Sequence, residues 1–152
     1  MENLLVGIDF DKGTFPQKHT CDGEDVSPEI RIGRIHVKYL AIIIDDIIGP
    51  SESFTHWLIW NIEARDIIPE NIPKKAEITE PFRAVQGKND FGTVGYRGPC
   101  PPTAEVHSYF FSVYGYDFLL DIPPGSDKKT LMEAMKGQMV QYGNEAIATY
   151  RT

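Results

Sequence analysis

The chain has little of what a membrane protein or a disulfide scaffold requires. Its 152 residues include only two cysteines, Cys21 and Cys100, and these do not form a CxxC pair. The longest apolar run, residues 39–44, is far shorter than the roughly 20 residues that span a membrane. Glu2 stands where a signal peptide would carry positive charge. We therefore expect a soluble, cytoplasmic protein with reduced thiols, but Cys100 lies in a proline-rich loop, so a bridge to Cys21 stays open.

Positive charge is also scarce. Fifteen Lys and Arg residues oppose 22 Asp and Glu residues, which gives a formal net charge of −7. A chain this acidic is a poor candidate for binding nucleic acid or anionic lipid through its overall charge. Apolar residues make up 41% and charged residues 24%, which is typical of globular proteins. The length predicts one domain over residues 1–152 with a core of its own.

Common catalytic and metal-binding motifs are missing. The sequence contains no GxSxG, HExxH, GxxxxGK[ST] or GxGxxG motif and no EF-hand loop. The run Asp22-Gly23-Glu24-Asp25 carries three carboxylates, but it lacks the spaced ligands of a calcium loop. We expect this run to be a structural loop, and we expect no metal ion, no cofactor and no enzymatic activity.

Three runs rich in β-branched and aromatic residues predict long strands, over residues 37–44, 54–62 and 107–116. Eleven prolines and 13 glycines are spread along the chain, which indicates many loops. Residues 67–75 and 86–103 have the composition of such loops. We expect a mainly β protein in which two sheets pack as a sandwich.

One helix is expected near the C-terminus, where Ser126 or Asp127 can cap its first turn after Pro-Pro-Gly. Apolar residues that recur at helical spacing are Leu131, Met132, Ala134, Met135, Met139 and Val140. A stripe of this kind is more often internal than a partner groove, so we expect Leu131, Met132, Met135 and Met139 to lie in the core. Gly137 predicts a kink or an early end of the helix.

Two histidines each begin a predicted strand directly after a loop. By strand alternation, His56 shares a face with Phe54, Leu58 and Trp60, and His107 shares one with Tyr109 and Phe111. Asp45 and Asp46 end the preceding strand. Imidazoles, a carboxylate, a tyrosine hydroxyl and the N–H groups of a Gly/Pro loop would together form a small oxyanion pocket. Two alternatives stay open: both histidines are structural, or they bind zinc with Asp46, although their spacing is not typical of a zinc site.

Five segments of the sequence carry a family resemblance. They are TCDGEDVSP (20–28), THWLIWNI (55–62), QGKNDFG (86–92), GYRGPCPP with HSY (95–102 and 107–109), and EAMKG (133–137). These motifs resemble the phosphatidylethanolamine-binding protein (PEBP) family, also called Raf kinase inhibitor-like, in its bacterial and archaeal branch. The resemblance runs from about residue 15 to the C-terminus. It implies a sandwich of two antiparallel sheets with a C-terminal helix and short peripheral helices.

The resemblance also implies an anion pocket at one end of the sandwich. Carried over to this sequence, the ligand-binding residues are Asp46, His56, Gly98, Cys100, Pro101, Pro102, His107 and Tyr109. One segment differs from the family motif. The family has Asp-Pro-Asp-Ala-Pro where this chain has Asp46-Ile47-Ile48-Gly49-Pro50. Ile48 replaces the second aspartate, so the pocket would lose a carboxylate and gain apolar surface at its rim.

Three functions remain in competition. The first is the binding of a small phosphate-like or carboxylate group, such as the head of a lipid or nucleotide, in a regulatory role. The second is inhibition of a kinase or a serine protease, as the resemblance implies. The third is an acid–base enzyme such as a hydrolase that uses His56, Asp46 and His107. Cys100 and Ser108 lack an obvious activating base, which makes the enzyme the weakest of the three, and the sequence does not indicate the oligomeric state.

Overall fold

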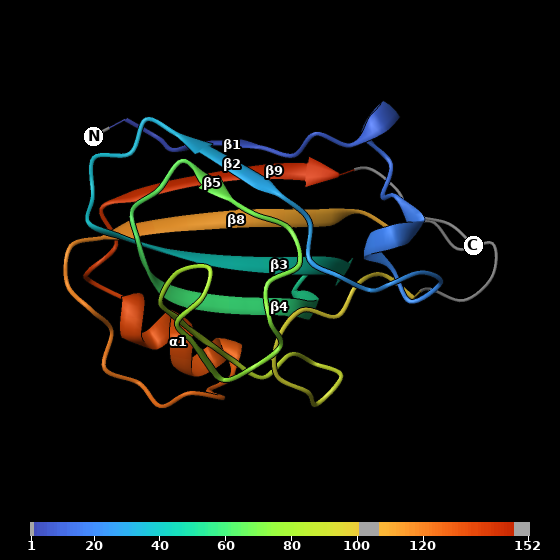
Figure 1. The fold of residues 1–152 in the computed structure, drawn as a ribbon. Coiled ribbons are helices and arrows are strands. Elements are labelled where there is room, and N and C mark those ends of the chain that lie inside the picture. The colour runs from blue at the N-terminus through green and yellow to red at the C-terminus, as the bar shows by residue number, and fades with distance from the viewer. Residues whose placement is uncertain (1, 101–106, 148–152) are drawn as a thin grey trace.

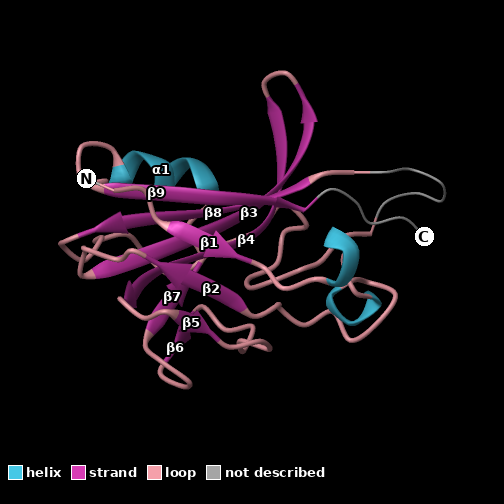
Figure 2. Cartoon of the chain, turned by 90° about the horizontal axis from the view of Figure 1, so that it is seen from above, coloured by secondary structure: helices cyan, strands magenta, loops and turns pink. Residues whose placement is uncertain are grey.

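The computed structural model describes residues 2–100 and 107–147, which form two antiparallel sheets (Figures 1 and 2). The smaller sheet has the strand order β1-β2-β5, and the larger has the order β6-β7-β4-β3-β8-β9. The strands are β1 (Leu5–Gly7), β2 (Ile30–Gly33), β3 (Tyr39–Gly49), β4 (Glu52–Glu63), β5 (Ile67–Ile68), β6 (Glu77–Ile78), β7 (Ala84–Gln86), β8 (Tyr109–Tyr116) and β9 (Gln141–Ile147). The predicted mainly β architecture of two antiparallel sheets is confirmed.

The three long predicted strands form the centre of the larger sheet, where β3 pairs with β4 on one side and with β8 on the other. Alternation along β3 divides its side chains between two buried layers. Ile42 and Ile44 face the smaller sheet, while Ala41 and Ile43 face the opposite side. Because both faces of β3 are covered, its sequence is a continuous apolar run instead of an alternating one.

Helix α1 (Lys128–Met135) covers the face of the larger sheet that points away from β1, β2 and β5 (Figure 2). Its cap is Asp127, whose side chain accepts a hydrogen bond from the backbone N–H of Thr130. The helix ends at Met135, and Gly137 follows with a φ of +82°, a backbone conformation that favours glycine. The predicted early end at Gly137 is thereby confirmed. Two short 3-10 helices, η1 (Asp11–Gly13) and η2 (Gln17–His19), lie near the N-terminus.

The prediction for the methionine-rich face is only half right. Leu131 and Met135 are buried, as expected, because they lie one helical turn apart and both point toward the sheet. Met132 lies about 100° further around the helix, and it is 37% exposed. Met139 lies beyond the end of α1 and is 48% exposed. The buried part of the stripe is thus Leu131 and Met135 alone.

Strand β9 was not expected from the sequence, whereas a Cys21–Cys100 bridge had been left open. Residues 141–147 have a weak β pattern, yet they pair with β8 from Tyr109 opposite Ile147 to Gly115 opposite Gln141. Cys21 and Cys100 form a disulfide, so the expectation of reduced thiols is wrong. Within residues 2–100 and 107–147, no helix is long and apolar enough to cross a membrane.

Candidate functional site

A β-bulge in β4 sets the direction of His56. Along β3, Ile44 and Asp45 are consecutive, but their partners on β4 are residues 57 and 55, so His56 is an extra residue in the ladder. Bulges of this kind re-aim a side chain and are common beside functional sites. Leu58 and Trp60 pack in the layer under α1, whereas His56 faces a cavity at the end of the sandwich. The predicted common face of His56, Leu58 and Trp60 is therefore wrong, because simple alternation does not continue through a bulge.

This cavity has a volume of about 210 Å³ and brings together most of the expected site residues. It is lined by Asp46, Ile48, Phe54, His56, Phe91, Cys100, His107 and Tyr109. Tyr109 shares the inner face of β8 with Phe111, as alternation predicted. Phe54 lines the cavity beside His56, on the face that alternation predicted for it, and Phe91 is a lining residue that was not expected from the sequence. Pro101 and Pro102 lie outside the described residues.

An ion pair between Asp46 and His107 connects β3 to the segment that precedes β8. The Nδ1 of His107 donates to Asp46 Oδ2, which orients the ring at the cavity wall. The Asp46 side chain is 8% exposed. Its other oxygen, Oδ1, is buried and has no hydrogen-bond partner among the described residues. Among the described residues, the His107 ring is therefore the hydrogen-bond partner that orients the Asp46 carboxylate.

His56 is held in one orientation by the loop before Cys100. Its Nδ1 donates to the carbonyl oxygen of Arg97 at 2.6 Å, because a carbonyl can only accept. The ring is 3% exposed, and burial lowers the pKa of His56 below its usual 6.5, against the opposing effects of the Arg97 carbonyl and the Asp46 charge. His56 is accordingly neutral at pH 7, with Nε2 as the nitrogen that gains or loses the proton.

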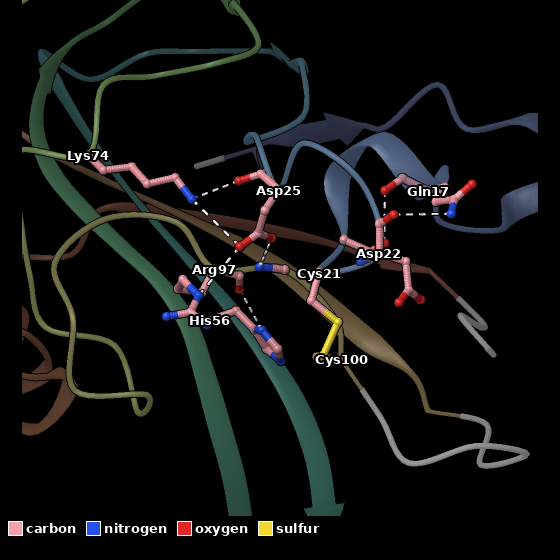
Figure 3. Close-up of a disulfide and its surroundings, with 10 residues drawn as sticks. Gln17, Cys21, Asp22, Asp25, His56, Lys74, Arg97 and Cys100 are labelled. Atoms are coloured by element: carbon pink, nitrogen blue, oxygen red, sulfur yellow. Dashed lines mark hydrogen bonds and ion pairs between the residues drawn. A yellow bond between two sulfur atoms is a disulfide. The ribbon is translucent and has the colours of Figure 1, made fainter.

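The loop that carries Arg97 and Cys100 is fastened to residues 19–26 by several contacts, shown in Figure 3. The Cys21–Cys100 disulfide is one of them, and Asp25 supplies others. Asp25 Oδ1 accepts a hydrogen bond from the Gly98 N–H at 2.7 Å, and Asp25 Oδ2 lies 3.4 Å from Arg97 Nε. The acidic run thus has the structural role predicted for it, and no group of three or more metal-ligating side chains occurs among the described residues.

The expectation that Gly98 binds the ligand needs correction. Gly98 is not among the described residues that line the cavity, and its N–H already donates to Asp25. A Cβ atom at this position would lie 1.9 Å from the carbonyl oxygen of His19, so only glycine allows the two loops to approach this closely. Gly98 therefore positions the loop, and through Arg97 the ring of His56, without contacting the cavity.

The lowered pKa of His56 predicts a pH dependence of stability. The unfolded chain takes up this proton near pH 6.5, whereas the folded protein takes it up at lower pH. The stabilising contribution is complete above about pH 6.5 and is lost as pH falls through the folded pKa. We expect the free energy of unfolding, measured with urea from about pH 8 to 5, to decline more steeply in the wild type than in His56→Gln. Parallel pH profiles would show that burial of His56 does not favour its neutral form.

Comparison with known proteins identifies the family. The sequence profile of the family described as phosphatidylethanolamine-binding protein matches residues 8–151. A UPF0098 protein of Pyrococcus horikoshii is 46% identical over 97% of this chain and 76% of its own length. A UPF0098 protein of Pyrococcus abyssi is also 46% identical, over 98% of this chain and 85% of its own length.

Solved structures agree with this assignment. The crystal structure of a PEBP homologue from Chlamydia trachomatis superposes with a TM-score of 0.83 at 29% identity and covers 99% of this chain and 98% of its own. E. coli YbcL, described as a member of the mammalian PEBP family, has the same fold, with a TM-score of 0.85 at 22% identity over 99% of each chain. The family resemblance seen in the sequence motifs is confirmed, and the chain belongs to the bacterial and archaeal branch of the phosphatidylethanolamine-binding protein family.

Proposed function

We propose that the cavity between His56 and His107 binds a small oxyanion, of the phosphate or carboxylate type. Membership in the PEBP family supports a ligand-binding protein. The observation that carries the finer proposal is the convergence of two imidazoles, one from β4 and one from the segment before β8, on one cavity of about 210 Å³. The Asp46 carboxylate fixes one of these rings, and the Arg97 carbonyl fixes the other.

The charges around the cavity favour an anion only when both histidines are protonated. Two imidazolium rings and one carboxylate, that of Asp46, then give a local charge of about +1, which a bound anion neutralises. A neutral His56 removes one of these positive charges from the cavity. Because burial lowers the pKa of His56, the anion has to bind together with a proton at neutral pH. Affinity therefore increases as the pH falls.

The acid–base enzyme has less support than binding. A His107–Asp46 pair could act as a general base, but a nucleophile is also needed for covalent catalysis. Cys100 lines the cavity, yet its sulfur is bonded to Cys21, and a disulfide sulfur is not a thiolate. The bridged protein thus lacks the thiol nucleophile that its sequence offered.

Calorimetric titration with sulfate tests the proposal, since sulfate keeps a constant charge where histidine titrates. We expect wild-type affinity to fall from about pH 5.5 to 7.5, by up to about tenfold per unit for each proton taken up. His56→Ala and His107→Ala should each bind sulfate at least about tenfold more weakly at pH 5.5, the loss expected for a charge-assisted hydrogen bond. His36→Ala is a matched control, because His36 is exposed and pairs with Glu2 away from the cavity. Equal affinity in all four proteins across this pH range would contradict the proposal.

A further inference from the structure

The entrance of the cavity differs in chemistry from its interior. His56 and Asp46 are 3% and 6% exposed, so the polar groups lie deep. Two apolar lining residues, Ile48 and Phe91, are 52% and 37% exposed and therefore lie at the outer wall. Large apolar side chains with this exposure beside a polar interior are typical of a surface that a ligand covers.

The β3–β4 hairpin brings Ile48 to this entrance. Gly49 pairs with Glu52 at its tip, and Figure 2 shows the tip standing away from the body of the sandwich. Ile48 is an extra residue in the ladder, because Ile47 pairs with Ser53 and Gly49 with Glu52, and it lines the cavity together with Asp46. Ile47 is exposed to a similar extent, 48%, but it is not among the residues that line the cavity.

Phe91 is fixed in place by its neighbours in spite of its exposure. Its ring lies edge-on to Phe54 at 4.8 Å and to His56 at 5.5 Å, measured between ring centroids. The guanidinium of Arg97 lies over the Phe91 ring at 4.7 Å. The Phe91 side of the apolar wall is thus already in place before a ligand arrives, which lowers the entropic cost of binding against it.

We propose that the site selects oxyanions that carry an apolar substituent, and that Ile48 and Phe91 determine this selection. The inference rests on the oxyanion function proposed above. An inorganic anion at His56 and His107 leaves Ile48 and Phe91 in contact with water, whereas an alkyl or aryl ester of the same anion covers them. Each fully buried methylene group strengthens binding about fourfold. Position 48 carries an isoleucine where the family motif has an aspartate, so the entrance offers the substituent apolar surface in place of a charged group.

Calorimetry with four phosphates at about pH 5.5 separates the two parts of the site, because all four are mainly monoanions there. The ligands are inorganic phosphate, methyl phosphate, butyl phosphate and phenyl phosphate. In the wild type we expect butyl phosphate to bind at least about tenfold more tightly than methyl phosphate, less than full burial of three methylenes would give. Ile48→Ser should remove most of this difference, because the serine side chain offers the butyl group much less apolar surface. Ile47→Ser, the matched control in the same hairpin, should retain the difference.

The outcomes distinguish this inference from the function on which it rests. Failure of all four phosphates to bind would overturn the oxyanion function itself. Equal binding of methyl, butyl and phenyl phosphate would leave that function intact and overturn the selection. If butyl phosphate binds more tightly than methyl phosphate by the same factor in Ile48→Ser and in the wild type, the role of Ile48 is overturned. Tighter binding of either butyl or phenyl phosphate than of methyl phosphate supports the inference and identifies the substituent as aliphatic or aromatic.

Discussion

Removal of the Cys21–Cys100 disulfide is expected to lower the free energy of unfolding by roughly 2–5 kcal/mol. The two cysteines are 79 residues apart, so the bridge closes a long loop of the unfolded chain. Loop-closure entropy for this length amounts to about 4.5 kcal/mol, which places the expectation in the upper part of the range. A Cys21→Ser/Cys100→Ser protein compared with the oxidised wild type by urea denaturation gives the value.

Reductant supplies the control for this experiment. The wild type should lose the same stability when it is reduced, whereas the double serine variant should not respond to reductant at all. A difference below roughly 0.5 kcal/mol between oxidised and reduced wild type would contradict the expectation. The folded loops retain other contacts in either case, since Asp25 accepts from Gly98 and the Tyr96 hydroxyl donates to the His19 carbonyl. We therefore expect the reduced protein to fold.

Met135→Ala is expected to cost roughly 2–5 kcal/mol, because truncation leaves a cavity between α1 and the larger sheet. Met135 is 2% exposed and packs in the same layer as Ile43, Leu58 and Leu131. Met132→Ala is the matched control, since it makes the same truncation in the same helix at a residue that is 37% exposed. Its cost should stay within about 0.5 kcal/mol. Similar losses in the two variants, measured by urea denaturation, would show that the exposed and buried methionines contribute alike.

The sequence predicted the strands that form the centre of the molecule because their composition is extreme. Residues 37–44 are apolar except for Lys38, and six of the nine residues in 54–62 are apolar, as burial on both faces favours. The last strand could not be recognised in the same way. Residues 141–147 contain a glycine, an asparagine and a glutamate, and they form β9 because β8 offers a free edge for pairing. Where the β propensity of a segment is weak, pairing with a neighbouring strand thus determines whether the segment forms a strand.

The site was predictable as a set of residues but not as a geometry. Asp46, His56, Cys100, His107 and Tyr109 do line one cavity, as the motifs implied. The face of His56 was missed, because the bulge depends on the register between β3 and β4 and leaves no mark in the sequence of β4 alone. The role of Gly98 was missed for a related reason. Gly98 lies against His19, which is 79 positions away in the sequence, and the residues around either position do not predict this close contact.

The central claim, that an anion binds at the two histidines, is tested most directly by NMR on protein with 15N-labelled histidine. Spectra recorded from about pH 5 to 8, with and without saturating sulfate, follow the titration of each ring. We expect sulfate to raise the pKa of His56, because a bound anion stabilises the imidazolium that burial disfavours. His36, exposed and distant from the cavity, should not respond and serves as the internal control. A His56 titration that is the same with and without saturating sulfate would contradict the account.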